Sequence, residues 1–200
     1  MTPRSGPKTI HGRQQQRASL AVIAPFLPAN WSIVLRAVSD LFDESAIARI
    51  ERQIDEWLGR ARASHVNILA VDRSDEDEFR WYVRMAGEEK DFTTIWFTLG
   101  QRTLRYETYV MPAPEQNSEA LYESLLRRNE KLVGVHFSIG LEDAIYLRGE
   151  IGLAALNETE LDRIIGTLYS TVEQLFWPLL EIGYAKAATL RTQRDSTRTI

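Results

Sequence analysis

Residues 92–110 read FTTIWFTLGQRTLRYETYV, and this stretch decides the fold. Aromatic and β-branched residues fill its first half, as they do in strands. Gly100 and Gln101 then suit a two-residue hairpin turn with glycine first. Apolar residues alternate from Leu104 to Val110 on the return strand. The stretch therefore predicts an antiparallel hairpin.

Alternating apolar residues extend this hairpin on both sides. Residues 79–85 alternate and predict a strand before it, which gives a three-stranded meander. Residues 133–139 and 145–151 alternate in the same way and predict a second hairpin. The segment 65–77 reads as irregular, although residues 66–71 also fit a short strand.

Helical spacing appears in three places. Apolar residues recur at three- and four-residue intervals in 47–58, 121–126 and 161–180. The last helix opens with Asn157 followed by Glu160, which resembles a capping box. Pro178 is expected to kink or divide that helix, because proline removes a backbone donor.

These elements predict an α+β domain over residues 40–190, with a five-stranded antiparallel sheet, flanking helices and the order α-βββ-α-ββ-α. Residues 1–39 contain five basic side chains and no acid, and are expected to be a disordered basic arm. Residues 191–200 are expected to be a polar tail. The apolar segment 18–29 faintly resembles an export signal, but two prolines interrupt it, so we interpret it as part of the arm.

Composition narrows the class of function. The chain has no cysteine, which excludes disulfides and thiolate chemistry and fits a cytoplasmic location. Residues 40–200 carry 19 basic and 28 acidic side chains, so this part is a poor nucleic-acid binder. The apolar segment 18–29 is too short to span a bilayer, and no membrane insertion is expected.

No motif for catalysis, phosphate binding or metal binding occurs. The chain lacks a Gly-x-Ser-x-Gly elbow and both glycine-rich phosphate loops, and its three histidines share no ligand spacing. We therefore predict no catalytic residue, metal or cofactor, and no enzyme. The alternative is an unrecognised enzyme with a small-molecule pocket near His136 and Arg148.

Six residues are predicted to contact a partner. Arg127, Arg128 and Asn129 fit a helix C-terminus, where arginines complement the dipole and asparagine stops the helix in the left-handed conformation, but arginines also bind carboxylates. The other three are Tyr82, Trp96 and Tyr109, which point opposite to their apolar neighbours. They would be exposed if helices cover one face of the sheet, and buried if helices cover both.

The region from about Phe79 to Tyr184 resembles the bacterial YbjN family of sensory transduction regulators. The matching segments are TLRYETYVMP (103–112), Asn117 with Leu121-Tyr122, LLRRN (125–129), FSI (137–139), IYLR (145–148) and ELDRIIGTL (160–168). The resemblance covers a little over half of the chain. It implies a fold like that of the type III secretion chaperones, which are dimers that hold extended partner segments. It carries no catalytic residue over.

Together these observations predict a non-enzymatic, chaperone-like or regulatory module that binds a protein partner. Strand addition at a sheet edge, or a helix in an apolar groove, would supply the contact. The alternative is a self-associating homodimer that uses the same surfaces.

Overall fold

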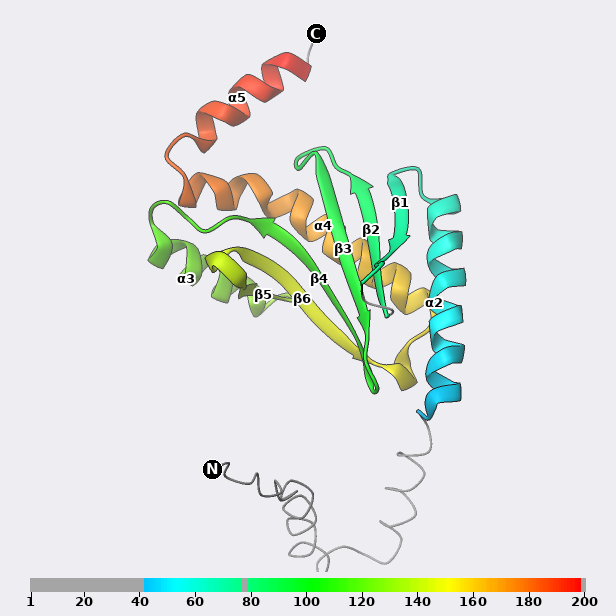
Figure 1. Ribbon diagram of the computed structural model, residues 1–200. Coiled ribbons are helices and arrows are strands. Elements are labelled where there is room, and N and C mark those ends of the chain that lie inside the picture. Colours follow the sequence, from blue (N-terminus) through cyan, green and yellow to red (C-terminus); the bar gives the residue numbers. More distant parts are fainter. Residues whose placement is uncertain (1–41, 77–78, 199–200) are drawn as a thin grey trace, which may run out of the picture. The chain divides into compact units, whose positions relative to one another are not determined.

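The computed structural model describes residues 42–76 and 79–198, and its centre is one antiparallel sheet (Figure 1). The strands follow the order β1-β2-β3-β4-β6-β5 across the sheet. Their bounds are β1 Ile68–Arg73, β2 Arg80–Ala86, β3 Phe92–Leu99, β4 Thr103–Met111, β5 His136–Ile139 and β6 Ile145–Gly152. The predicted meander is β2-β3-β4, and the predicted second hairpin is β5-β6.

The predicted number of strands was wrong, because the sheet has six strands and not five. The additional strand, β1, pairs with β2 at the sheet edge. Only Ile68 among its six residues is buried, and the strand ends in the polar pair Asp72 and Arg73. An edge strand of this kind lacks the alternation by which strands are found in sequence.

The helices lie beside and behind the sheet. Their bounds are α2 Glu44–Ser64, α3 Ser118–Asn129, α4 Glu158–Gly183 and α5 Ala187–Arg198, with short 3-10 turns at Leu141–Asp143 and Leu153–Ala155. The observed order is therefore α-ββββ-α-ββ-α-α. In Figure 1, α4 crosses behind β3 and β4, and no described helix crosses in front of them.

The core fills the space between α4 and the sheet. Alternate residues of the central strands are buried there, including Trp81, Ile95 and Phe97. The long apolar stripe of α4 supplies the other side, as its spacing predicted. The Asn157 side chain accepts a hydrogen bond from the Glu160 amide over 3.0 Å and caps this helix. Pro178 does not divide α4, which runs unbroken to Gly183.

The C-terminal end departs from the expected tail. Residues 187–198 form α5, whose composition is polar. Arg194 docks this helix by donating hydrogen bonds to the Glu88 and Glu89 carbonyls, and its guanidinium lies 5.2 Å from the centroid of the Trp177 ring. The expected basic arm, residues 1–39, lies outside the described residues.

Candidate functional site

The face of the sheet opposite α4 carries polar and aromatic side chains where the covered face carries apolar ones. We call this the open face. Its residues are Arg80, Tyr82 and Arg84 of β2; Phe92, Thr94, Trp96 and Thr98 of β3; Arg105, Glu107 and Tyr109 of β4; and Tyr146, Arg148 and Glu150 of β6. All are half-buried or exposed, and Phe92 is 59% exposed.

Strand register places the polar and aromatic residues of this face in rows across the sheet. Arg80 lies opposite Thr98, which lies opposite Arg105. In the next row, Trp96 lies between Tyr82 and Glu107. Residues far apart in the chain thereby form one surface, because antiparallel strands bring alternate side chains to the same face.

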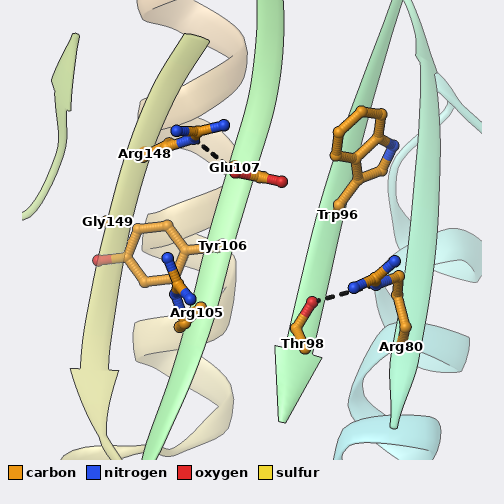
Figure 2. A pocket seen from close by; sticks show the side chains of 8 residues that line it. All are labelled: Arg80, Trp96, Thr98, Arg105, Tyr106, Glu107, Arg148 and Gly149. Carbon is orange, nitrogen blue, oxygen red and sulfur yellow. Dashed lines mark hydrogen bonds and ion pairs between the residues drawn. The ribbon is translucent and has the colours of Figure 1, made fainter. Parts of the chain in front are cut away.

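A hollow of about 260 Å³ opens on this surface, and we call it the arginine hollow. Its lining residues are Arg80, Trp96, Thr98, Arg105, Tyr106, Glu107, Arg148 and Gly149. Figure 2 shows Arg148 and Glu107 joined across β6 and β4, with Trp96 and Arg80 on the other side. The Arg148 Nε lies 2.6 Å from the Glu107 Oε2, and the Arg80 Nε donates to the Thr98 hydroxyl over 3.3 Å.

Arg105 differs from the other two arginines of the hollow. Its side chain is exposed, and its guanidinium makes no ion pair or hydrogen bond with any residue that the structure describes. The arginine hollow therefore holds the Arg148 guanidinium, which is paired with a carboxylate, and the Arg105 guanidinium, which has no partner in the described chain. The unpartnered Arg105 guanidinium favours an incoming anion.

An aromatic track leads away from the hollow, and it consists of Trp96, Tyr146 and Tyr109. The rings of Trp96 and Tyr146 lie 6.1 Å apart, and those of Tyr146 and Tyr109 lie 5.6 Å apart in an edge-on arrangement. The guanidinium of Arg148 lies 4.6 Å from the Tyr146 ring centroid. The track and the hollow are therefore continuous.

Lys90 stands at the far end of the aromatic track. Its Nζ donates to the Tyr109 carbonyl and lies 4.9 Å from the Tyr109 ring centroid. Burial lowers the pKa of Lys90 to about 8, and the nearby Glu173 carboxylate opposes this shift. Burial also raises the pKa of Tyr109, with smaller contributions from Tyr184 and Tyr146.

The Glu173 carboxylate holds the β2–β3 loop beside Lys90. It accepts hydrogen bonds from the backbone amides of Glu88, Glu89 and Lys90, over 2.6, 2.8 and 3.2 Å. Three amide donors fix the carboxylate of α4 against the loop. Glu173 therefore fixes the position of the loop that carries Lys90.

The structure separates the six residues predicted to contact a partner into two groups. Tyr82, Trp96 and Tyr109 lie together on the open face, and each is half-buried. The other three lie at the end of α3. Arg127 is exposed and pairs with Glu123 of the same helix over 2.5 Å, and the Arg128 Nε is 3.4 Å from the Ser124 hydroxyl.

Asn129 has a role inside the fold. Its Oδ1 accepts a hydrogen bond from the Phe137 amide over 2.7 Å, and its Nδ2 donates to the Phe137 carbonyl over 3.3 Å. Both bonds attach α3 to β5, the strand at the sheet edge. The interpretation of Asn129 as a left-handed helix stop was wrong, because among the described non-glycine residues only Asn117, Glu142 and Asp143 have positive φ.

A second surface, the α3–β5 groove, lies beside Asn129. It is lined by Tyr122, Leu125, Leu126, Asn129, Phe137, Ser138 and Ile139 and has a volume of about 310 Å³. Two of its apolar side chains face solvent, with Leu126 70% and Ile139 49% exposed. His136 begins β5 and pairs in register with Arg148, but it does not line the arginine hollow.

The sequence analysis did not select Arg80, Arg105 or Lys90. Two of the three could have been found, because Arg80 and Arg105 share the alternation that placed Tyr82 and Tyr109 opposite their apolar neighbours. Lys90 carries no such signal, since its burial comes from the distant residues Tyr109 and Phe176.

The described residues contain neither a metal-binding cluster nor a membrane-spanning helix. Within 42–76 and 79–198, no three His, Asp or Glu side chains gather in a way that could hold a metal ion. Over the same ranges, every helix is too short or too polar to cross a membrane.

Both the sequence and the fold of this chain resemble those of known proteins. Residues 53–181 match the model of a family, YbjN, which is described as "Putative bacterial sensory transduction regulator". An uncharacterized protein of Mycobacterium leprae is 31% identical over 123 residues, which cover 62% of this chain and 67% of that protein. An uncharacterized protein of Mycobacterium tuberculosis is 35% identical over 102 residues, which cover 51% of this chain and 56% of that protein.

Two solved structures resemble the fold in part. One is the heterodimeric complex ExoU–SpcU from the type III secretion system of Pseudomonas aeruginosa, at 15% identity and a TM-score of 0.46, covering 64% of this chain and 98% of the matched chain. The other is the ExsC–ExsE complex, at 17% identity and a TM-score of 0.43, covering 65% and 92%. Both TM-scores lie below 0.5, so the resemblance stays a partial one.

Proposed function

The chain belongs to the bacterial YbjN family, and from this premise we propose that it is a non-enzymatic cytoplasmic module that binds a protein partner across the open face of its sheet. The observation that carries the proposal is the aromatic track, which lies uncovered on a face that no described helix crosses. Half-buried aromatic side chains next to arginines are the residues that contribute most to protein interfaces.

Binding on the face is favoured over strand addition at the β5 edge. An added strand needs free backbone groups along the edge. Phe137 stands in the middle of the four-residue strand β5, and Asn129 already bonds both its amide and its carbonyl. The edge therefore has little backbone to offer a partner, whereas the open face has side chains from four strands.

Paired variants test the proposal by capture from a lysate of the source bacterium. Trp96→Ala removes the end of the aromatic track that also lines the arginine hollow, and Tyr122→Ala removes an aromatic side chain of the α3–β5 groove as the matched control. We expect the wild-type protein and Tyr122→Ala to retain the same bound protein and Trp96→Ala to lose it. Equal capture by all three proteins would overturn the proposal.

A second candidate, self-association, is favoured by the exposed apolar side chains of the α3–β5 groove. Leu126 and Ile139 would be covered if two copies met there, and adjacent Leu141 is 83% exposed. Burial of such residues is what stabilises homodimers. Light scattering during size-exclusion chromatography tests this directly. A homodimer in the wild type that becomes a monomer in Leu126→Glu supports it, and a wild-type monomer contradicts it.

A further inference from the structure

The open face carries the opposite charge from the rest of the molecule. Four arginines, Arg80, Arg84, Arg105 and Arg148, stand on this face against three acids, which are Glu107, Glu150 and Asp72 of the edge strand β1. The chain from residue 40 onward has 19 basic and 28 acidic side chains. A locally basic face on an acidic body selects an anionic partner at this face and repels it elsewhere.

The arginine hollow concentrates this positive charge. Arg105 has no partner among the described residues, while Arg148 is neutralised by Glu107. A carboxylate entering the hollow would meet the free Arg105 fork, with the Thr98 hydroxyl and the Arg80 guanidinium on the same side. Guanidinium forks match the geometry of carboxylates, which can accept two hydrogen bonds at once.

Resting on the proposed function, we infer that the partner is an extended acidic segment of a protein, whose carboxylate enters the arginine hollow and whose following apolar or aromatic residue lies on the aromatic track. The carboxylate and the apolar residue are neighbours in the segment, because Trp96 belongs to both the hollow and the track. The hollow supplies charge recognition and the track supplies apolar burial. A segment that offers only one of the two fits half of the site.

A nucleic acid fits the same surface less well. Its bases would stack on the track, but its phosphates would pass Glu107 and Glu150 on the open face and then the acidic body. A peptide places its negative charge only where the hollow can receive it. This difference makes a single-stranded RNA a useful competitor in the test.

Fluorescence anisotropy with defined peptides tests the inference on the full chain. The probe is a labelled peptide of alternating glutamate and serine followed by phenylalanine and leucine, and its control has glutamine in place of each glutamate. Arg105→Glu reverses the free charge of the hollow. Arg52→Glu makes the same change on the exposed surface of α2, away from the sheet face. Circular dichroism confirms that both variants fold.

We expect the glutamate peptide to bind the wild type and Arg52→Glu alike, and to bind Arg105→Glu roughly tenfold or more weakly, as the loss of a charged hydrogen bond implies. The glutamine peptide should bind the wild type weakly, and added salt should weaken binding of the glutamate peptide. These results together would support the acidic segment.

Other results overturn it and separate it from the proposed function. Equal binding of both peptides, lost in Trp96→Ala, removes the acidic preference but keeps a partner on the open face. Tighter binding of oligouridylate, in competition with the peptide, replaces the protein segment by a nucleic acid. If no peptide binds, the inference of an acidic segment is overturned. The capture experiment with Trp96→Ala then tests the proposed function by itself.

Discussion

The two faces of β3 and β4 differ in what determines their side chains, although the same strands build both. On the covered face, Phe97 and Tyr106 are 0% and 2% exposed, and their rings lie 6.4 Å apart. On the open face, Trp96 and Tyr109 are half-buried and contact Tyr146. The covered residues pack within the fold, whereas the open ones are the residues that we propose contact a partner.

The two tyrosines of β4 show this difference most clearly. Tyr106 donates its hydroxyl to the Gly134 carbonyl over 2.7 Å, and a Cβ on Gly149 would lie only 2.4 Å from its ring. Every part of that side chain is used within the fold. Tyr109, three residues later, contacts Lys90 and Tyr146 with its ring, and its hydroxyl donates no hydrogen bond to any residue that the structure describes. A partner would gain more binding energy from Tyr109 than from Tyr106, because the Tyr109 hydroxyl can still form a hydrogen bond.

Substitution of the neighbours Phe97 and Trp96 gives the largest expected effect and tests the comparison directly. Phe97→Ala should lower the free energy of unfolding by about 3–5 kcal/mol, because it opens a cavity in the core. Trp96→Ala should lower it by about 1 kcal/mol, since a half-buried ring loses less apolar contact. Urea denaturation measures both. Similar losses would mean that the open face is part of the core.

The pH dependence of stability tests the boundary between the faces, where Lys90 lies. Its pKa is about 8 in the folded chain and ordinarily 10.5, so the unfolded chain binds more protons between these values. The free energy of unfolding should therefore rise by about 2 kcal/mol from pH 8 to 10. Above pH 10 the ionisation of Tyr106 and Tyr109, whose pKa values the fold raises, should lower it again.

Lys90→Met is the control for this rise. It removes the titrating amine and leaves Glu173, the carboxylate that faces it from α4, together with its three amide donors. We expect the denaturation midpoint of this variant to stay level between pH 8 and 10. An undiminished rise in Lys90→Met would assign the effect to other groups.

The covered face was predictable from sequence, and the reason is local. Alternation along β2, β3 and β4 identifies which residues point to the core, because the side chains of a strand repeat every two residues. The same alternation placed Tyr82, Trp96 and Tyr109 on the opposite face. It could not tell whether a helix covers that face, since this depends on the packing of α4 against β3 and β4.

The edge strand, the burial of Lys90 and the role of Asn129 were not predictable, because each depends on contacts between residues that are distant in the chain. The edge strand β1 has one buried residue, and its charged end pairs with α2, where Arg73 lies 2.6 Å from Glu51 and 3.1 Å from Asp55. Lys90 is buried by residues 19 and more positions away. Asn129 bonds a strand that begins seven positions later, and so its helix-stop interpretation failed.

Asn129→Ala tests this structural assignment. The variant loses both hydrogen bonds to Phe137, and we expect the free energy of unfolding to fall by about 1–2 kcal/mol. It also frees the amide and carbonyl of an edge strand, which promotes association between sheets. Urea denaturation and light scattering measure the two effects. A stability equal to that of the wild type would return Asn129 to the set of partner residues.

Arg127→Ala should have the smallest effect of all, and it sharpens the comparison between the open face and the end of α3. Arg127 and Glu123 are one helical turn apart, and their side chains are 76% and 60% exposed. Such a pair contributes about 0.3–0.5 kcal/mol, so the urea midpoint should hardly move. If the partner lies on the open face, Arg127→Ala should also capture it as the wild type does. Loss of capture with unchanged stability would move the partner to the end of α3, because only a contact made outside the fold can disappear while stability remains.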